Sequence, residues 1–194
     1  MGYPGTPFPN YPEIYQDPDE SMCVPVCLKI VLEIMKKTVK RIPNLSIKEI
    51  ANLIGTDADG TIPSKNIENI NVKLNATSPQ INFETDLGDI RWGSIKSDVH
   101  EENPLQTPVI ALIGQYDTQE MGWMKHAVVI LDAQDDYTFY WDPFYGPISE
   151  PTNLFFRKWD QLQRFCVRLK HIPRIQTLLE EYPTKTKREN DESD

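Results

Sequence analysis

Several features that define large protein classes are scarce in this sequence. It holds only three cysteines in 194 residues, and no apolar segment opens it. An odd number of scattered cysteines does not build a disulfide framework, so we expect a reducing, cytoplasmic setting in which a free thiol can react. No stretch reaches the roughly 20 consecutive apolar residues that cross a bilayer, so we expect no membrane span.

Positive charge is scarce as well. The formal net charge is -9, whereas a protein that binds nucleic acid needs a basic face to neutralise phosphate. The sequence also lacks a GxxxxGK[ST] loop, the pattern that holds nucleotide phosphates. We therefore expect no nucleic-acid partner and no cofactor.

What is present suffices for one globular domain. Hydrophobic residues make up 39% of the sequence, and a chain of this length buries a core without metal or disulfide support. We expect a flexible proline-rich arm over residues 1–10, a single domain over 11–182 and a disordered charged tail over 183–194. Helical patterns come first and β-rich runs later, which predicts an α+β fold.

The stretch from Gln16 to Leu32 has the pattern of a reactive cysteine at a helix start. Apolar residues recur at helical spacing after Cys23, and Ser21 is placed to cap the first turn. Unpaired amides at a helix start favour negative charge, and the thiolate is the attacking form of cysteine. Gln16 would supply a side-chain donor to an oxyanion, with the backbone N–H of Cys23 as the second donor. The alternative is that Cys23 and Cys27 are small buried residues on one helix face.

A β-hairpin pattern supplies a base and an orienting carboxylate. Two β-rich runs flank the polar loop DAQDD at residues 132–136. If Leu131 pairs with Tyr137, His126 lies directly opposite Asp142, and both side chains project from the same face. A nucleophilic cysteine needs such a base, and the base needs a group that orients it.

Together these elements resemble the papain-like cysteine peptidases that process bacteriocins at a double-glycine leader. That family has a Gln before a Cys-Gly-Pro-Ala-Cys-like motif, then a His followed by a hydrophobic strand, then Asp-Pro and a Gly. The matching elements here are Gln16, CVPVC at 23–27, HAVVIL from His126, and Asp142-Pro143 with Gly146. The segments IKEIANLIGTDADGTIP and FFRKWDQL extend the resemblance over residues 11–172.

The resemblance implies a papain-like α+β fold with N-terminal helices, in which the nucleophile helix packs on an antiparallel sheet. By position it implies Cys23 as nucleophile, His126 as general base, Asp142 as orienting residue and Gln16 as oxyanion donor, acting on a peptide or protein substrate. Val24 stands where the family has Gly or another small residue, so its branched side chain is expected to narrow the acyl site. Without a membrane span or a phosphate loop, we expect a stand-alone cysteine peptidase rather than one fused to a transporter.

Three other functions would use the same residues. An acyltransferase would pass the acyl group from Cys23 to an amine or thiol instead of water. A catalytically inactive binding module would keep the papain-like fold alone. A metal site at Cys23, Cys27 and His126 is a further alternative, although this spacing lacks the paired ligands of structural zinc sites.

The remaining patterns predict most of the other elements. Ser46 and Glu49 form a capping box for a helix that ends at Gly55. The DADG sequence at 57–60 predicts a solvated turn, because it lacks the rest of a twelve-residue calcium loop. We expect residues 115–125 to form a loop, with Trp123 on the wall of the cleft. Further helices are expected at 64–72, 87–98 and 175–182, a helix or turn at 155–162, and strands at 107–114 and 165–172.

Overall fold

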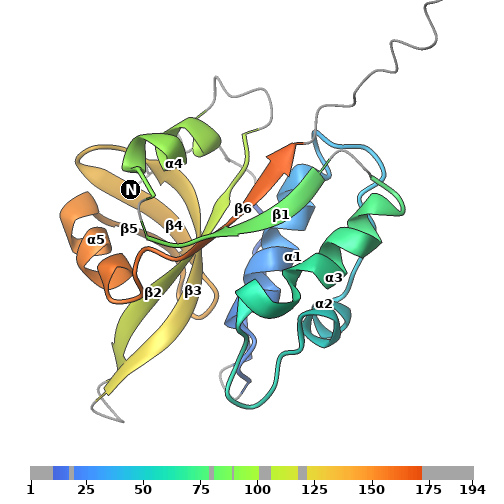
Figure 1. Cartoon of the computed structure of the whole chain (residues 1–194). Coiled ribbons are helices and arrows are strands. Elements are labelled where there is room, and N and C mark those ends of the chain that lie inside the picture. Colours follow the sequence, from blue (N-terminus) through green and yellow to red (C-terminus); the bar gives the residue numbers. More distant parts are fainter. Residues whose placement is uncertain are drawn as a thin grey trace, which may run out of the picture.

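The chain folds into a six-stranded antiparallel sheet with helices on both faces (Figure 1). A computed structural model describes residues 11–17, 20–78, 81–88, 90–100, 106–117 and 122–171. The predicted arm at 1–10, helix at 175–182 and tail at 183–194 lie outside these residues. The predicted α+β class is confirmed.

In the described residues three helices precede all the strands, as the sequence predicts, and two further helices lie between strands. The strand order in the sheet is β1-β6-β2-β3-β4-β5. The elements are α1 Cys23–Met35, α2 Ile47–Ile54, α3 Pro63–Asn75, β1 Ile81–Asp86, α4 Trp92–Val99, β2 Val109–Asp117, β3 Gly122–Ala133, β4 Tyr137–Asp142, β5 Gly146–Pro151, α5 Thr152–Asp160 and β6 Cys166–His171.

Helix α1 is the central helix of the fold. It packs on β3, and α2 packs against it from outside, so that α1, α2 and α3 cover one face of the sheet while α4 and α5 cover the other (Figure 1). Ten of its 13 residues are buried, which is expected of a helix that is apolar on nearly every side. A helix held this firmly is a rigid base for a reactive residue at its first position. Among the described residues, no helix is long and apolar enough to cross a membrane.

The predicted ends of α2 are confirmed. The Ser46 hydroxyl accepts from the Glu49 backbone N–H at 3.2 Å, and the Glu49 carboxylate accepts from the Ser46 backbone N–H at 2.7 Å. Gly55 ends the helix with a left-handed φ of 67°, a conformation that costs glycine little. The turn at 57–60 is also present, since the Asp59 backbone N–H donates to the Asp57 carboxylate at 2.9 Å.

Several sequence-based assignments need correction. Strands β1 and β5 have no predicted counterpart, and α4 begins at Trp92 rather than at residue 87. Residues 115–125 are mostly strand, because β2 runs to Asp117 and β3 begins at Gly122. In this extended hairpin Trp123 pairs with Tyr116 across the ladder, with ring centroids 5.6 Å apart. A cross-strand aromatic pair stabilises such a hairpin.

The predicted register of the β3–β4 hairpin is wrong by two residues. Ile130 pairs with Tyr140, and a β-bulge follows between Ile130 and Asp132. Extending the ladder from this pair brings Asp142 opposite Val128. His126 and Asp142 are therefore diagonal rather than direct neighbours. A shift by two residues keeps every side chain on its face, so the two still project together.

A buried amide ties α3 to the edge strand β1. The Asn71 side chain donates to the Phe83 carbonyl at 2.8 Å and accepts from the Phe83 N–H at 2.7 Å. Asn71 is 3% exposed. Its amide thus takes the place of a neighbouring strand at an otherwise open sheet edge.

We expect Asn71→Ala to lower the free energy of unfolding by about 2–4 kcal/mol, because it leaves a buried N–H and a buried C=O without partners. Urea unfolding followed by circular dichroism measures this change. The control is Asn69→Ala, which removes an exposed bond from the same helix to the Leu53 carbonyl and should cost less than about 1 kcal/mol. Equal losses in the two variants would contradict the edge-locking role of Asn71.

Candidate active site

Cys23 is the first residue of α1, as predicted. The helix has Met22 at its N-cap position and no side-chain cap. The predicted cap is wrong, because the Ser21 hydroxyl instead donates to the Ala58 carbonyl at 2.8 Å. This bond fastens the residues before α1 to the turn after α2. Cys23 is half-buried, and the unpaired N–H groups of the first turn favour a negative charge there.

His126 and Asp142 lie together in the sheet, beside Cys23. The Nε2 atom of His126 is 3.1 Å from Oδ1 of Asp142, and the two side chains are each 3% exposed. This is ion-pair distance, although the N–H is not aimed along a well-aligned hydrogen bond. The imidazole also interacts with the Cys23 side chain, through a hydrogen bond that favours its charged form. The structure thus brings cysteine, histidine and carboxylate together.

The environment of His126 favours its charged form. Burial alone lowers the pKa of this imidazole, but the contact with Asp142, the hydrogen bond with Cys23 and the charges of both outweigh burial. The pKa rises from 6.5 to about 9. The surroundings of His126 therefore favour the imidazolium at neutral pH.

The turn between β4 and β5 holds Asp142. Its Oδ1 atom accepts from the backbone N–H of Phe144 at 2.8 Å and from that of Tyr145 at 3.2 Å, so the carboxylate caps its own turn. Gly146 closes the turn with a φ of 80°, and an added Cβ there would lie 3.2 Å from the Tyr15 hydroxyl. Both features explain why a glycine follows the Asp142-Pro143 pair at this distance.

The same turn positions Gln16. The Gln16 backbone N–H donates to the Pro143 carbonyl at 2.9 Å, and the Trp141 indole donates to the Ile14 carbonyl at 3.0 Å. The Gln16 side chain is 7% exposed. Its Nε2 donates to the Glu20 carbonyl, which uses one of the two N–H groups of the amide.

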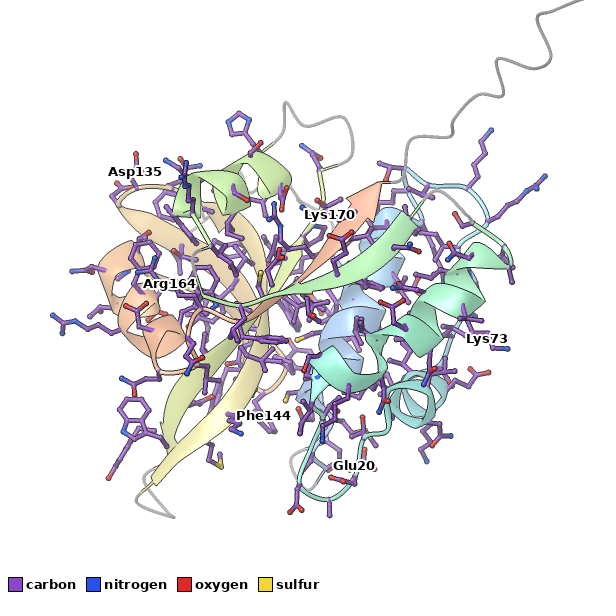
Figure 2. All side chains as sticks on the ribbon, viewed as in Figure 1. Glu20, Lys73, Asp135, Phe144, Arg164 and Lys170 are labelled. Carbon is purple, nitrogen blue, oxygen red and sulfur yellow. The ribbon has the colours of Figure 1, made fainter. Side chains whose placement is uncertain are left out.

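These residues line one cleft between the sheet and the helices, with a volume of about 480 Å³. Figure 2 shows Phe144 and Glu20 at the same end of the molecule, and both line this cleft. Trp123 does not line it, so its predicted place on the wall is wrong. The lining residues are Gln16, Glu20, Ser21, Cys23, Val24, Asp59, Gly60, Thr61, Leu112, Met124, Lys125, His126, Ala127 and Phe144.

Val24 and Cys27, which lie near Cys23 on α1, are both buried, whereas Cys23 is half-buried. Val24 is only 3% exposed and belongs to the hydrophobic core, and it also lines the cleft beside Cys23, so the expected narrowing of the acyl site stays a prediction. Cys27 is fully buried, and this burial, with the charges of Cys23 and Asp142, raises its pKa well above the ordinary value. Cys27 is thus held as a neutral thiol.

Phe144 belongs to the site without having been predicted from the sequence. Its ring stacks on the His126 imidazole, with centroids 5.2 Å apart and planes 17° from parallel. An aromatic residue two positions after the orienting aspartate was the available signal. Its stacking on a histidine of another strand depends on the turn geometry, which the pattern alone does not specify.

No protein-family model and no curated protein sequence matches this chain. Solved structures do match it in fold. A double-glycine-motif protease from an AMS/PCAT transporter, solved with its leader peptide, has a TM-score of 0.56 at 16% identity, over 84% of this chain and 93% of that one. The peptidase domain of Streptococcus ComA, a bifunctional ABC transporter of quorum sensing, has a TM-score of 0.56 at 17% identity, over 82% and 97%.

A Bacillus anthracis protein assigned as a C39-like peptidase has a TM-score of 0.58 at 15% identity, over 84% of this chain and 96% of that one. At these identities the likeness concerns the fold. The shared features are N-terminal helices packed on a six-stranded antiparallel sheet. The chain therefore has the papain-like α+β fold of the C39 double-glycine peptidase domains.

Proposed function

We propose that the protein is a stand-alone cysteine peptidase that cleaves a peptide or amide bond. The observation that carries this proposal is the group formed by Cys23 at a helix start, His126 beside it and Asp142 beside His126. A nucleophile, a base and an orienting group in this order are the parts of a thiol hydrolase.

In this proposal Cys23 and His126 rest as a thiolate and an imidazolium. The raised pKa of His126, about 9, supports a charged imidazole at neutral pH. The thiolate attacks the scissile carbonyl carbon, and the imidazolium gives its proton to the leaving amine. The neutral imidazole then takes a proton from water, whose oxygen attacks the thioester and releases the acid and the thiolate.

The negative oxygen of the tetrahedral intermediate needs donors. We assign this role to the Cys23 backbone N–H and to the second N–H of the Gln16 amide. The bond from Gln16 to the Glu20 carbonyl supports the assignment, because it fixes the amide plane while leaving one N–H for the substrate.

The proposed substrate is a peptide or protein, as for the transporter protease that was solved with its leader peptide. A cleft between two walls suits an extended chain better than a compact ligand. The three cysteines are free, which agrees with the proposed cytoplasmic setting. An acyltransferase would share every step up to the thioester, and adding an amine to the assay separates it from a hydrolase by the product formed.

The test is the rate of Cys23 alkylation by iodoacetamide at pH 6 and at pH 10, with the site located by mass spectrometry. An ordinary thiol with a pKa near 8.5 is about 300-fold less ionised at pH 6 than at pH 10. We expect the wild-type rate at pH 6 to stay within about tenfold of its rate at pH 10, because an imidazolium stabilises the thiolate. We expect His126→Ala to restore the ordinary ratio.

The rate at pH 10 serves as an internal control. At this pH thiols are ionised with or without His126, so equal rates there show that Cys23 is accessible in the variant, and circular dichroism shows that the variant is folded. A wild-type ratio equal to that of His126→Ala would overturn the peptidase proposal and leave the inactive binding module as the better account.

A further inference from the structure

Phe144 contacts both partners of the proposed nucleophile. Its ring covers one face of the His126 imidazole, 5.2 Å between centroids and 17° from parallel. Its backbone N–H donates to Oδ1 of Asp142 at 2.8 Å. One residue of the β4–β5 turn therefore meets the histidine through its side chain and the carboxylate through its main chain.

The imidazole needs such a constraint. Its Nε2 lies 3.1 Å from Oδ1 of Asp142, but this contact is not aligned well enough to fix the ring plane. Rotation about the bond between Cβ and the ring would move the imidazole nitrogens away from Asp142 and Cys23. A parallel aromatic ring on one face resists that rotation, because any tilt drives the two rings together.

An aromatic ring also suits the charge of this imidazole. The face of a benzene ring carries the negative part of its quadrupole and attracts a cation placed over it. A leucine of similar volume would fill the space without that attraction. The stack therefore favours both the position and the charged form of His126.

We propose that Phe144 is a positioning residue, which holds the His126 ring between Cys23 and Asp142 and holds the Asp142 carboxylate through its backbone N–H. This inference rests on the proposed function, because it assigns Phe144 a part in activating Cys23. Phe144 also lines the cleft, so it closes the side of the His126–Asp142 pair that would otherwise face water.

The other ionisable groups near His126 stay in place when Phe144 is changed. Cys23 faces it from α1 and Asp142 faces it from β4, and the deeper Cys27 interacts with both of these residues. Glu20, Asp59 and Lys125 line the same cleft. A change in the pH response of a Phe144 variant therefore reports the loss of the ring.

The test measures the alkylation of Cys23 at pH 6 and pH 10 in Phe144→Leu, Phe144→Tyr and Tyr145→Leu. We expect Phe144→Leu to lower the ratio of the rate at pH 6 to that at pH 10 by about tenfold, which corresponds to a thiol pKa higher by about one, with little change at pH 10. Phe144→Tyr keeps a stacking ring and should stay within about twofold of wild type, since that difference corresponds to only a small change in the thiol pKa. Tyr145→Leu is the matched control, because this exposed neighbour loses by the same substitution a ring that contacts Phe144, while its backbone N–H bond to Asp142 is kept.

A second readout separates failure of this inference from failure of the proposed function. The imidazole of His126 is titrated directly by NMR in wild type and in Phe144→Leu, which needs no reactive thiol. We expect the pKa of His126 to fall in Phe144→Leu and to hold in Phe144→Tyr. If Phe144→Leu does not fold by circular dichroism, Phe144→Met takes its place in both measurements.

The outcomes are distinct. In one outcome the alkylation ratio of Cys23 depends on His126, but Phe144→Leu keeps both the wild-type ratio and the wild-type titration of His126. This outcome overturns the positioning role of Phe144 alone. If the alkylation ratio of Cys23 is the same in wild type and in His126→Ala, the proposed function is overturned. The positioning role of Phe144 in catalysis is then overturned as well. If Phe144→Leu lowers the alkylation rate of Cys23 equally at pH 6 and at pH 10, the role of Phe144 is structural only. This outcome also overturns the positioning role.

Discussion

Cys23→Ala is expected to lower kcat/KM for peptide cleavage by at least ~10³-fold, since removing the nucleophile of a catalytic triad leaves only the contribution of binding and of the oxyanion donors. Cys23 begins α1 and its side chain meets His126. No other thiol of the chain is placed to replace it. Cys27 is buried with its pKa raised well above the ordinary value, and Cys166 is buried in β6.

The measurement needs a substrate, which a peptide library can supply. Wild type is incubated with the library, new peptide ends are identified by mass spectrometry, and kcat/KM is then determined for the peptide that is cleaved fastest. The matched control is Cys27→Ala, the same substitution one helical turn along α1. We expect its kcat/KM to stay within about tenfold of wild type, because the nucleophile is kept and only its packing is disturbed. Cleavage by Cys23→Ala at the wild-type rate would rule out the thiol mechanism.

The helix that carries Cys23 was predictable because its signals are local. Apolar periodicity set the course of α1, and the capping box with Gly55 set both ends of α2. These signals act between residues three or four positions apart, so a single sequence contains them. The predicted cap at Ser21 was wrong because the partner of its side chain is distant in the sequence. The Ser21 hydroxyl donates to the Ala58 carbonyl, 37 positions away, instead of accepting from a nearby N–H of α1.

The hairpin shows how a wrong detail can leave a right conclusion. The loop pattern predicted Leu131 opposite Tyr137, whereas the ladder begins at Ala133 and Thr138, three positions out of the predicted register. The β-bulge after Ile130 takes back one of these positions. The remaining error of two residues preserved the face, so His126 and Asp142 still project together. An error of one residue would have separated them.

Strand β1 and the role of Phe144 depend on contacts that the pattern does not specify. The alternation of Ile81 and Phe83 with polar residues was a usable signal for a strand, but six residues beside a loop are short. The edge of that strand is completed by Asn71 of α3, a helix residue. Phe144 meets His126 only once the Asp142 turn has formed, so its position follows from the tertiary structure.

A second large effect is expected from Asp142→Asn on the pH dependence of stability. In the folded protein the pKa of His126 is raised from 6.5 to about 9, so between these values the folded state binds a proton that the unfolded state has released. Stability from this source is fully present below pH 6.5 and is lost as the pH rises through about 9. Asp142→Asn keeps an oxygen for the turn but removes the charge that holds the proton.

The measurement is made in a Cys23→Ala background, because a thiolate paired with His126 would add a second linked proton. Urea unfolding at pH 6, 7, 8 and 9.5 gives the difference in unfolding free energy between the Asp142 and Asn variants. We expect the Asp142 form to be the more stable at pH 6, and its stability advantage to be smaller by about 2 kcal/mol at pH 9.5. A pKa difference of one between the folded and unfolded states corresponds to about 1.4 kcal/mol, and in this background Cys23 no longer contributes to the pKa of His126.

Asp132→Asn in the same background is the matched control. Asp132 is another buried carboxylate of this hairpin, but its partners are the Gln134 amide and the Tyr137 hydroxyl. Burial and the contact with Asp132 raise the pKa of Tyr137 to about 12, so neither partner titrates between pH 6 and 9.5. The stability difference for this variant should therefore be independent of pH. If the stability difference for Asp142→Asn is also independent of pH, Asp142 does not hold His126 in its charged form. The thiolate–imidazolium resting state would then be replaced by a neutral pair, in which His126 acts first as a base.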